Sequence, residues 1–139
     1  MLHQPQIKAA DLETIWRIRR DVLFPGHNIE RVKLKDDQEG THLAIFLNDA
    51  EPVSVISLFD RSGICQFRKF ATLQSHQGKG YGTLLLDRVM ILAKDMSATS
   101  IWCNARTTAR TLYERFGMQP AGPTRKENGH IYIKMEKHL

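Results

Sequence analysis

Three glycines at every second position, Gly78, Gly80 and Gly82, stand where an apolar run gives way to a helical pattern. Because glycine has no Cβ, the backbone can turn tightly at these positions and a ligand can approach it closely. A helix N-terminus adds free N–H groups and partial positive charge, both of which suit a phosphate. The stretch is therefore typical of a pyrophosphate cradle, assisted by the Lys79 ammonium and the Thr83 hydroxyl.

Neither common nucleotide-binding motif matches this stretch. A P-loop needs a lysine followed by Ser or Thr, whereas Lys79 is followed by Gly80. A dinucleotide-binding GxGxxG loop needs a different glycine spacing and an opening βαβ unit, whereas several strand-like runs precede this loop. The alternative interpretation is purely structural: a tight glycine turn that packs a helix against a strand and binds no ligand.

The periodicity around the loop predicts the elements that hold it. Asp11 is expected to cap a first helix, which Pro25-Gly26 ends. Residues 27–40 carry charge without a clear period, so we expect a loop there, and loops of that length are often functional. Strands are expected over 6–8, 41–47, 53–59, 64–72, 100–104, 118–122 and 130–137, and further helices over 82–96 and 107–116. This order favours an α/β (α+β) fold in which one mixed sheet has helices on both faces.

Composition restricts the class of protein. A chain of 139 residues predicts a single domain over 1–139. Lys and Arg number 20 against 15 Asp and Glu, and this net charge of +5 favours anionic partners. The basic residues form no run with interleaved aromatics, no apolar run is long enough to cross a bilayer, and residues 1–10 lack a secretory signal. We therefore expect a cytoplasmic protein without nucleic-acid or membrane partners, and a basic nucleic-acid-binding domain stays as an alternative.

The 2 cysteines and 6 histidines predict no metal site. Cys65 and Cys103 lack CxxC spacing and no histidine pair has HExxH spacing, so neither a disulfide framework nor a zinc site is expected. His42 stands in an apolar run, and we expect a core histidine whose ring nitrogens are satisfied.

Two motifs in the second half of the chain resemble the GNAT superfamily of N-acetyltransferases. Gln77-Gly78-Lys79-Gly80-Tyr81-Gly82 matches the Q/R-x-x-G-x-G/A signature by which that family binds acetyl-CoA. Asn104-Ala105-Arg106, Ala109 and the run from Leu112 to Met118 are similar to the family's N-A-x-x-A-x-x-F-Y-x-x-x-G-F segment. Leu112 and Met118 replace aromatic residues of that segment, and neither change removes a chemical group. The element order agrees with the family along the whole chain.

The resemblance implies a mixed, largely antiparallel seven-stranded sheet that splits open between its fourth and fifth strands. The pantetheine arm of acetyl-CoA would lie in the split and pair with the backbone from Phe70 to Thr72, and the pyrophosphate would sit on the amides of residues 77–83. The cofactor-binding residues implied are Phe70, Ala71, Thr72, Gln77, Gly78, Lys79, Gly80, Tyr81, Gly82, Thr83, Asn104 and Ala109. No metal is implied.

The reaction implied is the direct attack of a primary amine on the acetyl thioester in a ternary complex. Tyr113 is the expected general acid, because an ordinary tyrosine pKa of about 10 keeps the phenol protonated at neutral pH. A core aromatic without a chemical role is the alternative for Tyr113. No Asp or Glu occurs between Ile64 and Thr72 to serve as the base. His130, which starts the last strand, is therefore a candidate base, and a surface-turn histidine with a water chain as the proton carrier is the alternative.

Other polar side chains bear on the amine acceptor. Gln66 and Arg68 either find partners on neighbouring strands or line an acceptor cleft, where Arg68 would grip a substrate carboxylate. Arg17 and Arg20 on the first helix are expected to be solvated, and a place at the border of the acceptor site is the alternative. A polyamine, an amino acid, an aminoglycoside and a protein N-terminus all stay open as acceptors. A non-catalytic acyl-CoA-binding or regulatory module and a homodimer stay open as well.

Overall fold

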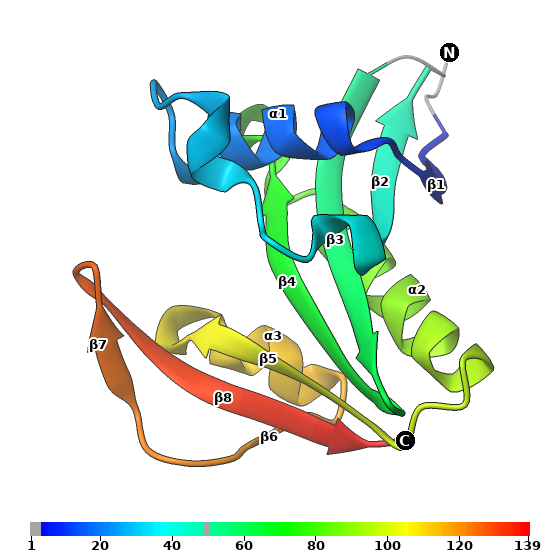
Figure 1. The fold of residues 1–139 in the computed structure, drawn as a ribbon, viewed down its shortest axis with the longest axis vertical. Helices are drawn as coiled ribbons and strands as arrows, with labels where there is room; N and C mark the ends of the chain where they lie inside the picture. The colour runs from blue at the N-terminus through cyan, green and yellow to red at the C-terminus, as the bar shows by residue number, and fades with distance from the viewer. Residues whose placement is uncertain (1–3, 49–50) are drawn as a thin grey trace.

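The helices and strands follow the periodicity of the sequence. The computed structural model describes residues 4–48 and 51–139 (Figure 1). Its strands are β1 (Gln6–Ala9), β2 (Thr41–Leu47), β3 (Glu51–Arg61), β4 (Ile64–Thr72), β5 (Ser100–Arg106), β6 (Gln119–Pro120), β7 (Arg125–Glu127) and β8 (His130–His138). Its helices are α1 (Leu12–Leu23), α2 (Tyr81–Asp95) and α3 (Arg110–Arg115), with the 3₁₀ turns η1 (Ile29–Val32), η2 (Asp37–Glu39), η3 (Gln74–His76) and η4 (Thr107–Ala109). The Asp11 carboxylate accepts a hydrogen bond from the Thr14 N–H at 2.9 Å, which confirms the predicted cap of α1.

One sheet carries the fold, in the order β1-β2-β3-β4-β5-β8-β6, with β7 also paired to β8. Its pairs are antiparallel except for β4 and β5, which run parallel and pair only over Ile64–Gln66 and Ser100–Trp102. Beyond this short pairing the two strands diverge, so β1–β4 and β5–β8 form two leaves that open away from each other (Figure 1). The predicted split between the fourth and fifth strands is confirmed.

The sheet has eight strands where seven were expected: the predicted strand over 118–122 is shortened to β6, and β7 lies in a segment where no strand was predicted. β6 and β7 pair with opposite ends of one edge of β8, whose other edge pairs with β5. Gly122 between them has φ 128°, and Pro123 has no N–H to donate to a ladder. β7 is thus an additional short strand beside β8, and the sheet is still seven strands wide along its path.

Helices cover both faces of the sheet, as predicted (Figure 1). The buried side of α2 shares a core with Ile45 and Ile101, while Ile15 and Ile18 of α1 pack on Ala44 in a second core. Successive residues of a strand face opposite sides of a sheet, so β2 contributes Ala44 to one core and Ile45 to the other. The two cores hold α1 and α2 in place on opposite faces of the sheet, and both helices contact β2, β3 and β4.

The segment between α1 and β2 was expected to be a loop, and the structure shows two 3₁₀ turns held by the buried Asp37. The two Nη groups of Arg19 donate to the two carboxylate oxygens of Asp37, each at 2.9 Å. The Trp16 indole N–H donates to the same carboxylate at 2.8 Å. Because both donors come from α1, this bidentate ion pair fixes the segment against the helix.

His42 is a core histidine with satisfied ring nitrogens, as the sequence predicted. It is buried, and its Nδ1 lies 2.7 Å from the Ser57 hydroxyl. Its Nε2 lies 2.7 Å from the backbone carbonyl of Asp37. The histidine therefore links β2 and β3 to the turn that carries Asp37.

No helix within residues 4–48 and 51–139 is both long enough and apolar enough to cross a membrane. In the same two ranges, no three His, Cys, Asp or Glu side chains gather in a way that would hold a metal ion. Cys65 and Cys103 are both buried, free thiols.

Candidate active site

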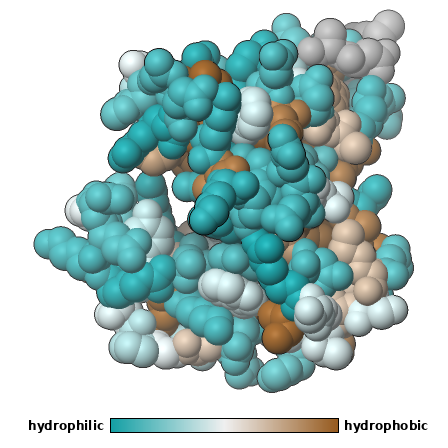
Figure 2. Space-filling model, in the orientation of Figure 1, coloured by the Kyte–Doolittle hydropathy of each residue, from teal (hydrophilic) through white to brown (hydrophobic). Residues whose placement is uncertain are grey.

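The split between the two leaves forms a cleft of about 640 Å³. Its walls come from the end of α1 and from η1 on one side, from β4 and β5, and from α3, β7 and β8 on the other side. Figure 2 shows mostly hydrophilic side chains on the two lobes on this face of the molecule. A cleft of this volume lies within the usual range for small-molecule sites, about 300–1,000 Å³.

A bulge in β4 lies at the edge of the cleft. The pairing of β4 with β3 shifts in the middle, so that Lys69 and Phe70 together oppose Ile56. Lys69 adopts the left-handed backbone conformation, with φ 54°. A bulge interrupts the ladder and leaves backbone groups unpaired. Toward the split, the described part of the chain gives β4 no strand partner after Gln66. The backbone from Phe70 to Thr72, predicted to pair with pantetheine, thus has no neighbouring strand on that side.

The glycine loop that precedes α2 has room for a ligand at two of its three glycines. Gly78 and Gly80 have φ values of 75° and 87°, and a Cβ added to either would meet no atom within 4 Å. Gly80 is the N-cap of α2 and provides no side-chain cap, so the first N–H groups of the helix are left for another acceptor. A Cβ at Gly82 would lie 3.0 Å from Cζ of Phe70. Gly82 therefore makes space for the Phe70 ring, as the structural interpretation required, while Gly78 and Gly80 face open space.

Gln77 holds the loop against the end of β4. Its side-chain Nε2 donates to the backbone carbonyl of Thr72 at 3.0 Å. Lys79 and Thr83 are exposed beside the turn, and the Tyr81 ring lies 6.2 Å from the His76 ring. The glycine loop and the end of β4 are thereby joined, so a ligand bound to the loop amides would extend directly toward the bulge in β4.

Tyr113 lies on α3 with its side chain at the cleft. The residue is 8% exposed and its ring centroid lies 5.7 Å from that of Phe67. Burial raises the pKa of the Tyr113 phenol, and the nearby Cys103 raises it further. The phenol therefore keeps its proton at any pH at which the fold would work. No partner within the described ranges accepts a hydrogen bond from this hydroxyl, which leaves it for a group in the cleft.

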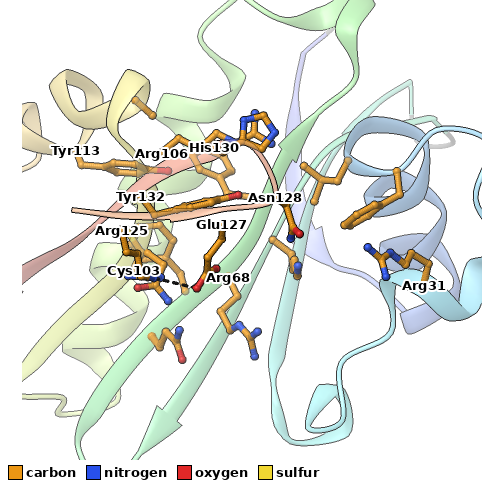
Figure 3. A pocket seen from close by; sticks show the side chains of 18 residues that line it. Arg31, Arg68, Cys103, Arg106, Tyr113, Arg125, Glu127, Asn128, His130 and Tyr132 are labelled. Atoms are coloured by element: carbon orange, nitrogen blue, oxygen red, sulfur yellow. Dashed lines mark hydrogen bonds and ion pairs between the residues drawn. The ribbon is translucent and has the colours of Figure 1, made fainter. Parts of the chain in front are cut away.

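The other predicted site residues lie in the cleft, in the loop or on β4 beside them. Arg68, Phe70, Asn104, Ala109 and His130 line the cleft together with Tyr113. Figure 3 shows Tyr113, Arg106, His130 and Tyr132 close together on one side. His130 is exposed, with its ring 6.3 Å from that of Tyr132. The residues from Gln77 to Thr83 lie outside the cleft, at the N-terminus of α2, and Ala71 is buried in the core beneath α1.

Positive charge dominates the cleft. Among residues 4–48 and 51–139, five basic side chains line it against one carboxylate, that of Glu127: Arg31, Arg68, Lys69, Arg106 and Arg125. Figure 3 labels Glu127 and the four arginines. Glu127 already accepts from Nε of Arg125 at 3.2 Å. Arg17 and Arg20 do not line the cleft, and Arg17 is exposed, as expected of a solvated helix face.

Sequence reasoning missed Arg31 and the individual role of Lys69 in this wall. Arg31 falls in the segment without periodicity, where no pattern indicates which side chain faces inward. Lys69 stands in a strand whose alternation the bulge reverses. The length of the 27–40 loop was the only signal, because long loops in small domains are often functional.

Comparison with protein families finds a match between residues 24–139 and the acetyltransferase (GNAT) domain. Among curated proteins, the uncharacterized N-acetyltransferase YitI of Bacillus subtilis is 27% identical over 126 residues, which cover 84% of either chain.

Solved structures share the fold. A Lactobacillus plantarum protein assigned as an N-acetyltransferase superposes with a TM-score of 0.84 at 19% identity, covering 100% of this chain and 99% of the other. A GNAT family acetyltransferase of Elizabethkingia anophelis, solved with acetyl-CoA bound, has a TM-score of 0.75 at 16% identity and covers 97% and 98% of the two chains. At these identities the likeness concerns the fold alone.

Proposed function

The chain belongs to the GNAT acetyltransferase family, and from this premise we propose an N-acetyltransferase that moves the acetyl group of acetyl-CoA to a primary amine by direct attack. One observation carries the proposal. The open turn at Gly78 and Gly80 leads, along the edge of β4 that has no strand partner, to the buried phenol of Tyr113. A long ligand with phosphates at one end and a reactive thioester at the other fits that layout. The acetyl-CoA bound by the Elizabethkingia relative supports the same cosubstrate here.

The loop residues would hold the phosphates. Free N–H groups at the start of α2 and the adjacent Lys79 ammonium suit a pyrophosphate, and the open space at Gly78 and Gly80 lets it approach. The backbone from Phe70 to Thr72 would then pair with the amides of the pantetheine arm, in the manner of an added strand. Asn104 and Ala109 line the opposite side of the same cleft.

Acetyl-CoA supplies the thioester carbonyl that the amine attacks. As negative charge develops on the carbonyl oxygen, backbone N–H groups freed by the bulge at Lys69 and Phe70 would stabilise it. The nitrogen bonds to the acetyl carbon as the carbon–sulfur bond breaks. Tyr113 gives its phenolic proton to the departing sulfur and regains one from solvent.

The amine must lose a proton before or during the attack. His130 lines the cleft and is the side-chain candidate for that role, since histidine titrates nearest to neutral pH. A chain of water molecules through the cleft is the alternative route. The basic wall assists either route, because nearby cations favour the uncharged form of a bound amine.

Free-thiol release from acetyl-CoA, measured against a broad panel of amines, tests the proposed function. We expect release that depends on both the amine and the protein, together with acetyl-CoA binding in calorimetry. Binding of acetyl-CoA without turnover of any amine would instead support the non-catalytic acyl-CoA-binding module. Absence of both binding and release would contradict the two functions together.

A further inference from the structure

We propose that the amine acceptor also carries an anionic group, a carboxylate or a phosphate, which Arg31, Arg68 and Lys69 bind on the α1 side of the cleft. The inference rests on the proposed N-acetyltransferase function and names the chemical class of its acceptor. Of the acceptors left open by the sequence, it favours amines of the amino-acid type over polyamines and aminoglycosides.

The cleft holds more positive charge than its own carboxylates compensate. Glu127 is the one acidic residue that lines it in the described part of the chain, and that carboxylate is paired with Arg125. Of the carboxylates that the structure describes, Arg68 forms an ion pair with Asp36 alone, with Nη1 and Oδ1 3.9 Å apart. Asp36 is also bound by the Arg61 guanidinium, so it neutralises Arg68 only in part.

Arg31 and Lys69 converge on one aromatic ring. The Arg31 guanidinium lies 4.9 Å and the Lys69 ammonium 5.9 Å from the ring centroid of Phe24, which itself lines the cleft. Neither cation has an ion-pair partner within residues 4–48 and 51–139. A cation on a ring face is held in position while its charge stays uncompensated. The ring therefore brings together two positive charges from separate segments of the chain.

The repulsion between these clustered cations affects the pKa of Lys69. Burial lowers the pKa of the Lys69 ammonium, and the cations of Arg68, Arg19 and Arg31 lower it further against the opposing effect of Asp37. Like charges held together in a half-buried wall oppose folding unless a ligand of opposite charge joins them. A bound carboxylate or phosphate would supply that charge and accept hydrogen bonds from all three side chains.

The phosphates of acetyl-CoA do not account for this cluster. Their proposed cradle is the turn from Gln77 to Thr83, and none of its residues lines the cleft. Arg31 comes from η1, and Figure 3 shows its guanidinium across the cleft from Arg125 and Glu127. The cations therefore face the space that the second substrate would occupy.

Matched amines test the acceptor class. Thiol release at saturating acetyl-CoA is measured for L-amino acids and their α-amides, for phosphoethanolamine and ethanolamine, and for spermidine. We expect at least one anionic amine to exceed its uncharged counterpart in kcat/KM by about tenfold or more, the effect of one charge-assisted hydrogen bond. Its acceptor KM should rise with added NaCl, because salt screens the attraction. The carboxylate and phosphate pairs distinguish the two sources of charge.

Variants locate the effect in the cluster. Arg31→Met, Arg68→Met and Lys69→Met should each raise the KM of the anionic amine about tenfold and leave the KM of acetyl-CoA unchanged. Arg17→Met removes an exposed cation of α1 outside the cleft and serves as the matched control, with circular dichroism to verify folding. If amides or spermidine react as well as anionic amines, the inference is wrong and the proposed function stands. If no amine of the panel releases CoA, the proposed function fails as well.

Discussion

Tyr113 is the residue on which the proposed chemistry depends most. Its phenol is buried, its pKa is raised, and its hydroxyl faces the cleft without a partner in the described chain. A group that stays protonated at working pH is suited to donate to a thiolate, which is a far stronger acceptor than a neutral thioester sulfur. Burial is equally expected of a core aromatic without a chemical role. Removal of the hydroxyl alone therefore distinguishes a general acid from a core aromatic.

Tyr113→Phe keeps the ring packed against Phe67 and removes the proton donor. We expect kcat to fall about 10²-fold or more, in line with the usual contribution of general acid catalysis, with little change in acetyl-CoA affinity or Tm. Tyr132→Phe removes a hydroxyl from the same cleft and should affect kcat far less. Near-native kcat in Tyr113→Phe, under conditions where chemistry limits the rate, would leave Tyr113 as a core aromatic.

His130 is the candidate base, and its removal should change the pH dependence rather than abolish the reaction. If it takes the proton of the amine, His130→Ala changes the shape of the profile of kcat/KM against pH. His138→Ala, at the other end of β8, is the control that loses an exposed histidine far along the same strand. Superimposable pH profiles for His130→Ala and the unmodified protein would assign the proton to water.

At the scale of elements, the glycine loop joins β4 to α2. A control glycine makes it possible to test two effects of a substitution there separately: the strain on the backbone and the loss of space for a ligand. Gly80 and Gly63 have nearly the same φ, 87° and 88°, and a Cβ at either would meet nothing within 4 Å. Gly63 lies in the turn between β3 and β4, away from the proposed cradle. An alanine at either position therefore introduces the same left-handed strain.

Gly80→Ala should weaken acetyl-CoA binding about tenfold or more, because the methyl group occupies the space through which a phosphate reaches the amides. Gly63→Ala should leave that affinity unchanged, while both variants lower Tm to a similar degree. Isothermal calorimetry and thermal unfolding measure the two effects. Equal affinity in both variants would reduce the glycine loop to a packing turn.

Elements were predictable wherever a local pattern decides the backbone. Asp11 at the start of α1 and the apolar run over 41–47 in β2 each indicated the correct element. The pattern failed after Met118, where the strand expected over 118–122 is shortened to β6 and the strand β7 was not predicted. It also gave no sign of the bulge at Lys69, because a bulge depends on how two strands register rather than on either sequence alone.

At the scale of the whole molecule, the sequence predicted the site residues that lie within a linear motif. It did not predict those that come from separate segments and meet only across the cleft. The glycine loop and Tyr113 stand in recognisable runs, so their places could be inferred. Arg31, Lys69 and Arg125 come from three separate segments, and only the divergence of β4 from β5 brings them to one cavity. Nothing in a list of 20 basic residues indicates which of them meet.

The buried ion pair of Arg19 and Asp37 connects the stability of the whole molecule to the geometry of the cleft. Asp37 fixes the segment that carries Arg31, and both partners are almost fully buried. Burial alone would raise the pKa of the Asp37 carboxyl. The hydrogen bonds from Arg19, from the Leu34 N–H and from Trp16 outweigh burial, so the pKa lies below its ordinary value. The folded state therefore holds the carboxylate charged more firmly than the unfolded chain does.

The sign of this shift sets the pH dependence of folding. The stabilisation is complete above the unfolded aspartate pKa of about 3.9, and it is lost as the pH falls through the lower folded value. Asp37→Asn leaves the Arg19 guanidinium buried without its counter-charge, so we expect about 3–5 kcal/mol of destabilisation at pH 7 and a weaker loss of stability in acid. The acceptor KM should rise as well, because the segment that holds Arg31 loses its anchor.

The control variant Asp21→Asn breaks only a surface pair with Arg20 and should lower the free energy of unfolding in urea by about 1 kcal/mol or less. Equal unfolding free energies for the two variants would show that Asp37 does not anchor the segment.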